Sequence, residues 1–161
     1  MSAIIISKGT ELLRIPQEKL VYISSEGNYS NVVTVDNRKR LVTYQLGQIE
    51  DMIGDQLGDD GSNFLRLGRS LIINTDYIYV IDIAKQQLIL SDCSGCYHEL
   101  SASREVLIKL KAYIESTREY YNRGGKFKDI PDKYPCVVYF GIADFDGMRG
   151  YDKKLDWICI G

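Results

Sequence analysis

Short apolar runs rich in β-branched and aromatic residues fill the first 44 positions of the chain and recur between residues 64 and 100. Runs of this length, separated by residues that favour turns, predict strands. In the first region the expected strands are Ile4–Ile6, Glu11–Arg14, Val21–Ile23, Tyr29–Val35 and Lys39–Tyr44. In the second region they are Phe64–Leu67, Leu71–Ile73, Ile78–Ile83, Leu88–Ser91 and Tyr97–Leu100. The pattern therefore predicts a mostly β domain.

A short helix is expected between the two strand-rich regions. Leu46, Ile49 and Ile53 recur at spacings of three and four, which places them on one helix face. Gly54 is expected to end this helix, because the following stretch to Asn63 is rich in Gly and Asp and favours an exposed loop.

A second helix is expected from about Ser103 onward. Leu107, Leu110 and Ile114, joined by Val106 and Tyr113, form an apolar stripe on one face. Ser101 or Ser103 can cap its N-terminus. The fold class is thus mostly β with two short helices, or α+β by content.

Composition places the chain among ordinary globular proteins. Of its 161 residues, 45% are hydrophobic and 26% are charged, and the net charge is -2. Bulk charge therefore gives no attraction toward phosphates, and any nucleic-acid surface must come from local clustering of Lys and Arg. Ile4–Ile6 is too short for a signal peptide, so a cytoplasmic location with reduced cysteines is the default expectation.

The last forty or so residues differ from the rest. Gly124, Gly125, Pro131 and Pro135 interrupt the chain after the second helix, and two strand-like runs follow, Cys136–Ala143 and Leu155–Ile160. The many aromatic residues are atypical of a disordered linker, so this part is expected to pack on its own domain or on another subunit. We therefore expect a domain over residues 1–118 and a β-hairpin-like C-terminal extension of unknown role over residues 119–161.

Three separated blocks of sequence carry a family resemblance. VYISSEGNYSNVVTVDNR, FLRLGRSLIINTDYIYVID and the hairpin that leads into HELSASREVLIKLK resemble, in this order, the LytTR family of bacterial transcription regulators. The resemblance covers about residues 3–118. It implies an elongated fold of antiparallel β-sheets that binds DNA through loops and strand ends.

The resemblance also implies which residues contact DNA. They are Asn28, Tyr29 and Asn31, the Arg69–Ser70 step, and Arg104. The residue types suit the task, because Arg can donate two hydrogen bonds to guanine, Asn can pair with the edge of adenine, and a Tyr hydroxyl can reach a phosphate. Without the resemblance, Gly27 and Asn28 would equally suit any tight loop between strands.

Arg104 carries a further argument from the residues alone. A cation in the first turn of a helix faces the positive end of the helix dipole, which disfavours it by a fraction of a kcal/mol. A bound phosphate would reverse that sign. Arg104 lies off the apolar stripe, so the guanidinium is expected to stay free for DNA.

Two further clusters have a structural reading beside the functional one. Arg38, Lys39 and Arg40 form the densest basic run and are candidate phosphate contacts, although a solvated cluster at a hairpin turn is the usual explanation. Cys93, Cys96 and His98 have the spacing of half a zinc site, but a fourth ligand would have to come from a distant residue. A tight turn around Ser94 and Gly95 is the favoured interpretation of that hairpin.

The function expected from these observations is that of a sequence-specific DNA-binding transcription regulator without a receiver domain. No phosphate-binding loop or nucleophile elbow is present, so we expect no enzyme, no cofactor and no small-molecule substrate. The expected partners are double-stranded DNA, a second copy on neighbouring sites, and a membrane-bound regulatory protein. The alternatives are a protein-interaction module on the same fold that has lost DNA affinity, or a metal- or thiol-responsive regulator.

Overall fold

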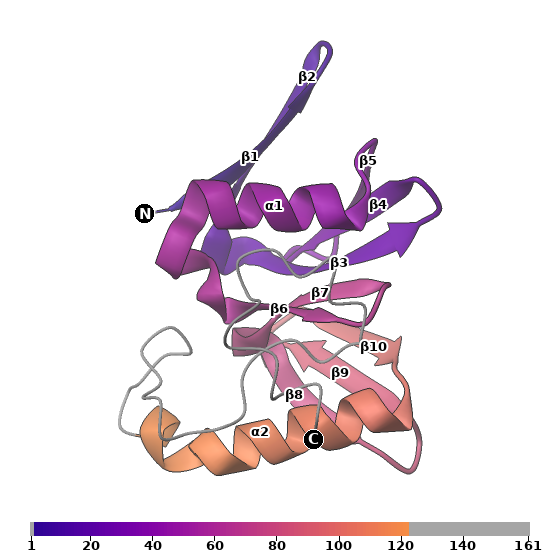
Figure 1. Ribbon diagram of the computed structural model, residues 1–161, viewed down its shortest axis with the longest axis vertical. Coiled ribbons are helices and arrows are strands. Elements are labelled where there is room, and N and C mark those ends of the chain that lie inside the picture. The colour runs from indigo at the N-terminus through magenta and orange to yellow at the C-terminus, as the bar shows by residue number, and fades with distance from the viewer. Residues whose placement is uncertain (1, 123–161) are drawn as a thin grey trace.

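The computed structural model describes residues 2–122, without the side chains of residues 59, 60, 62 and 116–122 (Figure 1). The strands are β1 (Ala3–Lys8), β2 (Glu11–Pro16), β3 (Leu20–Glu26), β4 (Tyr29–Thr34), β5 (Lys39–Val42), β6 (Phe64–Leu67), β7 (Leu71–Asn74), β8 (Ile78–Asp82), β9 (Gln87–Ser91) and β10 (Tyr97–Ser101). The helices are α1 (Leu46–Leu57) and α2 (Arg104–Asn122), with short 3₁₀ turns η1 (Gln17–Lys19), η2 (Gly58–Asn63) and η3 (Thr75–Tyr77). The expected mostly β fold is confirmed, and the predicted C-terminal extension lies outside the described residues.

The strands form three antiparallel sheets. The central sheet has five strands in the order β5-β4-β3-β7-β6, beside the two-stranded sheet β1-β2 and the three-stranded sheet β10-β9-β8. Because β3 pairs with both β4 and β7, residues distant in sequence meet at one end of the central sheet.

The central sheet separates two apolar cores. One face, with Ile23, Val32 and Ile72, packs against α1 and the β1-β2 hairpin. The other face, with Val33, Leu65 and Ile73, packs against β9 and α2. Alternation of side chains along each strand sends neighbouring residues into opposite cores, as a sheet buried on both faces requires.

A bulge in β3 breaks this alternation once. The register with β4 shifts between Leu20 and Tyr22, and Val21 and Tyr22 then both pack in the core that contains α2. Tyr22 also meets the His98 ring edge to face, with the ring centroids 5.3 Å apart. The bulge thus helps to join the central sheet to the three-stranded one.

Helix α1 is longer than the sequence predicted. It continues through Gly54 to Leu57, and the residues expected to form a loop are the end of this helix and η2. Gly54 lies on the exposed side, whereas Leu57 extends the buried stripe one turn beyond Ile53. The helix ends at Gly58, whose φ of 55° favours glycine.

Candidate nucleic-acid interface

Two of the segments predicted to contact DNA lie together at one end of the central sheet. The amide N of Ser25 donates a hydrogen bond of 2.9 Å to the carbonyl O of Ser70, one step beyond the pairing of Ser24 with Leu71. The β3–β4 loop and the β6–β7 turn are therefore neighbours, on the right-hand side of Figure 1. The fold brings Asn28 and Tyr29 next to the Arg69–Ser70 step.

The β3–β4 loop is a tight two-residue connection. Gly27 has a φ of 61°, which a residue with a side chain adopts only with strain, and Glu26 pairs with Tyr29 across the loop. Asn28 is exposed, and its side-chain Oδ1 accepts a 3.4 Å hydrogen bond from Nε2 of Gln45. Tyr29 is 46% exposed. Both side chains are thus presented to solvent by a short loop.

Asn31 is placed differently. It is half-buried on β4, and its Nδ2 donates to the Glu26 carboxylate at 2.5 Å. Its amide nitrogen is therefore engaged within the protein, and a carboxylate lies beside it. Sequence reasoning missed Glu26, although it directly precedes Gly27 in the loop that was singled out.

The β6–β7 turn presents Arg69 and Ser70, which are both exposed. Gly68 begins the turn with a φ of 65°, and no atom would lie within 4 Å of an added Cβ. Glycine is therefore favoured here by backbone conformation alone.

Arg66 supports this turn from the inside. Its Nε donates to the carbonyl O of Gly68 at 3.1 Å, and its Nη1 lies 2.8 Å from Oε1 of Glu50 on α1. The two side chains are only 15% and 9% exposed. A charged pair this well covered fixes geometry, because each charge needs the other once water is excluded. Sequence reasoning missed both residues; Glu50, next to Ile49 and four residues after Leu46, already lay on the apolar stripe.

The N-terminus of α1 lies at the same end of the sheet. Gln45 caps the helix in a reciprocal arrangement in which the Gln48 side chain accepts from the Gln45 backbone N at 2.8 Å. Since Gln45 also donates to Asn28, the helix cap and the β3–β4 loop are linked. The loop is held by contacts with α1 as well as by strand pairing.

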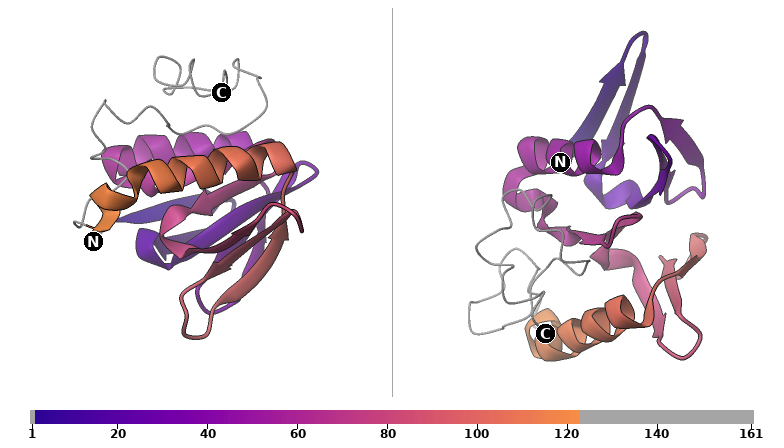
Figure 2. Two further views of the ribbon diagram at one scale, coloured as in Figure 1. Left: turned by 90° about the horizontal axis from the view of Figure 1, so that it is seen from below. Right: turned by 45° about the vertical axis from the view of Figure 1, so that its right-hand side comes forward.

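Arg104 is the first residue of α2, and Figure 1 shows this helix beginning on the same side as the two turns. Figure 1 and the right-hand view of Figure 2 both show the start of α2 further along the long axis of the molecule than the two turns. Ser103 caps the helix through a 3.3 Å hydrogen bond from the amide N of Val106. Arg104 is exposed, but its Nη1 donates to the carbonyl O of Ile83 at 3.4 Å, so the expectation of a free guanidinium was wrong. The bond is long, and its acceptor is the first residue of the β8–β9 turn.

The basic run Arg38–Arg40 lies elsewhere. Lys39 pairs with Val33 and Arg40 with Val32, toward the end of β4 that is distant from Tyr29. Arg38 lies 3.6 Å from the Asp36 carboxylate. Phosphate contact by these residues stays a prediction, and the structure does not bring them together with the two turns.

Cys93, Cys96 and His98 form no metal site in the described part of the chain, where no three His, Cys, Asp or Glu side chains gather. Three backbone amides, those of Ser94, Gly95 and Cys96, donate to Oδ1 of Asp92 and hold the pKa of that carboxyl below its usual range. Burial raises the pKa of the Cys96 thiol, which opposes formation of a thiolate. The tight turn expected around Ser94 and Gly95 is confirmed.

Comparison with known proteins bears on these arrangements. The family of the LytTr DNA-binding domain matches residues 10–115 of the chain. The chain belongs to this family. A LytTR domain is a DNA-binding module, so the two turns and the α2 start become the parts of this molecule to consider for contact with nucleic acid. The family assignment also confirms the resemblance found in the sequence.

Among solved structures, the chain is similar to a LytTr DNA-binding domain from Bacillus cereus, named as part of a methyl-accepting/DNA response regulator. The sequence identity is 19%, the TM-score is 0.45, and the match covers 71% of this chain and 95% of that one. No curated protein matches this LytTR chain. In residues 2–122, neither helix is both long and apolar enough to cross a membrane.

Proposed function

We propose that this LytTR protein is a sequence-specific DNA-binding transcription regulator that contacts duplex DNA with the β3–β4 loop, the β6–β7 turn and the start of α2. The observation that carries the proposal is the hydrogen bond between Ser25 and Ser70, because it places the Asn28–Tyr29 pair beside Arg69. Side chains able to read bases and side chains able to contact phosphates then share one edge. The family membership supports contact with DNA at large.

Within this edge the side chains have different tasks. Arg69 sits at the tip of a short, internally braced turn, where a guanidinium can enter the major groove and donate two hydrogen bonds to one guanine. Asn28 is exposed on the neighbouring loop and can pair with an adenine edge. The hydroxyl of Tyr29 can donate a hydrogen bond to a phosphate of the DNA backbone.

Arg104 is assigned to a phosphate. Its 3.4 Å bond to the Ile83 carbonyl is weak enough to exchange for a charged acceptor, and the first turn of α2 adds backbone amides that favour an anion. Because α2 begins further along the long axis than the two turns, we expect this contact at a separate point on the duplex (Figure 1).

The net charge of the chain implies weak sequence-independent affinity for DNA. The net charge is -2, and Glu26 lies at the proposed edge. Binding then depends on a few cations, and sequence readout must supply much of the affinity. We infer further that two copies of the protein bind neighbouring sites on the DNA. We also infer that the protein is cytoplasmic, that a membrane-bound partner can control it, and that the protein catalyses no reaction.

Selection of bound duplexes from a random DNA library tests the proposal. The intact chain, the double variant Arg69→Ala/Arg104→Ala and the control Arg14→Ala/Lys111→Ala, which removes two exposed cations elsewhere, are compared. We expect one enriched motif with the intact chain and the control, and none with the double variant. No enrichment by folded intact protein contradicts the proposal and favours a protein-interaction module on the LytTR fold.

A further inference from the structure

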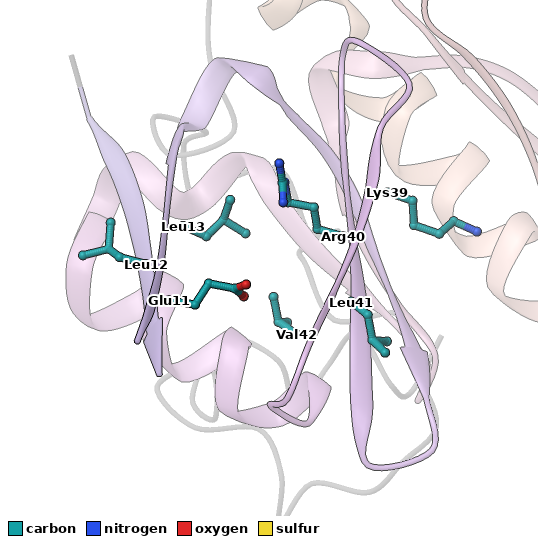
Figure 3. Close-up of a pocket in the computed structure, with 7 residues that line it drawn as sticks. All are labelled: Glu11, Leu12, Leu13, Lys39, Arg40, Leu41 and Val42. Carbon is teal, nitrogen blue, oxygen red and sulfur yellow. The ribbon is translucent and has the colours of Figure 1, made fainter. Parts of the chain in front are cut away.

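A groove lies between the β1-β2 hairpin and β5 at the edge of the central sheet, and its Val42 end pairs with Ser30, close to the β3–β4 loop. Its volume is about 410 Å³, and Figure 3 shows Glu11 and Leu13 of β2 facing Arg40 and Val42 of β5 across it. A second hollow of about 320 Å³ shares Leu13 and Arg40 and continues along β2 and β4. The two hollows therefore lie side by side between β2 and the β4–β5 hairpin.

The two strands that flank the groove both have an edge open for pairing. β5 is the terminal strand of the central sheet, and β2 pairs only with β1 among the described strands. The other edge of the hairpin is covered, because the Gln56 side chain accepts from the backbone N of Ile5 at 2.7 Å and donates to its carbonyl O at 2.8 Å. The protein thus closes the β1 edge and leaves those of β2 and β5 without a strand in the part of the chain that the structure describes.

The groove is basic. Five cations line its two hollows against two carboxylates: Arg14, Lys19, Arg38, Lys39 and Arg40 against Glu11 and Asp36. A hydrogen bond from the Thr34 hydroxyl, followed by one from the backbone of Arg38, holds the pKa of Asp36 below its usual value. Asp36 therefore stays ionised and offsets Arg38, which leaves the remaining excess of positive charge on β2, η1 and β5.

β5 carries one apolar and one cationic residue on each of its faces. All four residues of β5 line the groove, but the side chains of Arg40 and Val42 point toward β2, whereas those of Lys39 and Leu41 point away from it (Figure 3). Leu41 is 52% exposed. A strand added to β5 would lie beside an apolar and a cationic side chain on each face. Apolar and acidic side chains on the added strand would therefore stabilise the pairing. A second copy of β5 is a poor partner, since it would bring Lys39 and Arg40 close to their own copies.

We propose that residues 136–143 of this same chain, followed by Asp144 and Asp146, add to β5 as a further strand. This run, CVVYFGIA, is rich in β-forming residues, and residues 136–147 contain two Asp and no Lys, Arg or His. Its apolar side chains and the two carboxylates that follow complement the apolar and cationic side chains of β5. Its eight residues are enough to pair with the whole of β5. The proposal concerns residues outside the three segments proposed to contact DNA, and it does not rest on that proposed function.

The length of the chain permits this addition. Thirteen residues, 123–135, separate the end of α2 from Cys136. Extended, they span roughly 43 Å, and a domain of this size has a diameter on the order of 35 Å. Pro135 immediately before the run suits the position, because a proline at the start of a strand takes no hydrogen bond away from the ladder.

Amide hydrogen exchange of the full-length chain tests the proposal. We expect amides of residues 136–143 to exchange about tenfold or more slowly than unstructured ones, together with those of Lys39–Val42. Arg40→Glu, an exposed position, should remove most of this protection in both segments, as should Val138→Pro, which deletes an amide from the added strand. Lys85→Glu, an exposed cation on the β8–β9 turn, is the matched control and should change neither segment.

Reversing the charges on both strands tests the proposed pairing more directly. Arg40→Glu combined with Asp144→Lys and Asp146→Lys should restore protection that Arg40→Glu alone removes. Unprotected residues 136–143 in the intact chain overturn the proposal, and so does protection that persists unchanged in Arg40→Glu and Val138→Pro. Protection that grows with protein concentration means that the strand comes from a second copy, and protection of β5 that appears only with duplex DNA assigns the groove to nucleic acid; both outcomes overturn it as well.

Discussion

The Arg66 guanidinium joins the first half of α1 to the turn that carries Arg69. It lies 2.8 Å from the Glu50 carboxylate and donates at 3.1 Å to the carbonyl of Gly68. The proposed base-reading arginine is thus held by an ion pair that is nearly covered from solvent. The geometry of the proposed DNA-binding edge thus rests on this pair in addition to strand pairing.

Removing one partner of the pair should be costly. We expect Arg66→Met to lower the free energy of unfolding by about 3 kcal/mol, because it leaves the Glu50 carboxylate buried without its counter-charge. Urea unfolding at neutral pH measures the change. The double variant Arg66→Met/Glu50→Leu should recover much of the loss, and a double variant as unstable as the single one would show that packing, and not charge, carries the effect.

Gly68 offers a test of the turn itself. Gly68→Ala should cost about 1 kcal/mol, because an alanine is strained at a φ of 65° although the site has room for its methyl group. Gly68→Asn should cost less, since asparagine adopts this conformation more readily. Equal unfolding free energies for the two variants, measured in urea, would argue against a left-handed residue at this position.

The pH dependence of stability tests the environment of His98. Burial, followed by the charge of Lys39, holds the pKa of this imidazole below its ordinary value of 6.5. The unfolded chain therefore takes up the proton first, and stability should decrease as the pH falls below about 6.5. His98→Phe keeps a ring beside Tyr22 and removes the titration, so its unfolding free energy should decrease less between about pH 7.5 and 5.5. Identical losses in the two proteins would mean that His98 titrates normally.

The sequence predicted the elements well where one physical signal dominated. Alternation and β-branched residues located the ten strands, and three-four spacing located α1, because burial of one face imposes these periods. The end of α1 was misplaced at Gly54. A glycine on an exposed helix face costs only about 1 kcal/mol, and burial of Leu57 outweighs that cost.

The candidate site was predicted only in its parts. The family resemblance named Asn28, Arg69 and Arg104, but the proximity of Asn28 to Arg69 depends on β3 pairing with β7, which no local pattern reveals. The Arg66 and Glu50 pair escaped notice for the same reason, since their charges appear incompatible with burial until the partner is known. The hydrogen bond from Arg104 to Ile83 likewise depends on where the β8–β9 turn lies in space.

The affinity of single-arginine variants for the selected duplex and for a scrambled one tests the central claim most directly. The account predicts that Arg69→Ala weakens binding to the selected duplex by about 1 to 3 kcal/mol with little change for the scrambled one. It predicts that Arg104→Ala weakens binding to both duplexes alike. The slope of the binding constant against salt concentration, both on logarithmic scales, should decrease by about one phosphate contact. Unchanged preference for the selected duplex in Arg69→Ala would contradict the assignment of base reading to the β6–β7 turn.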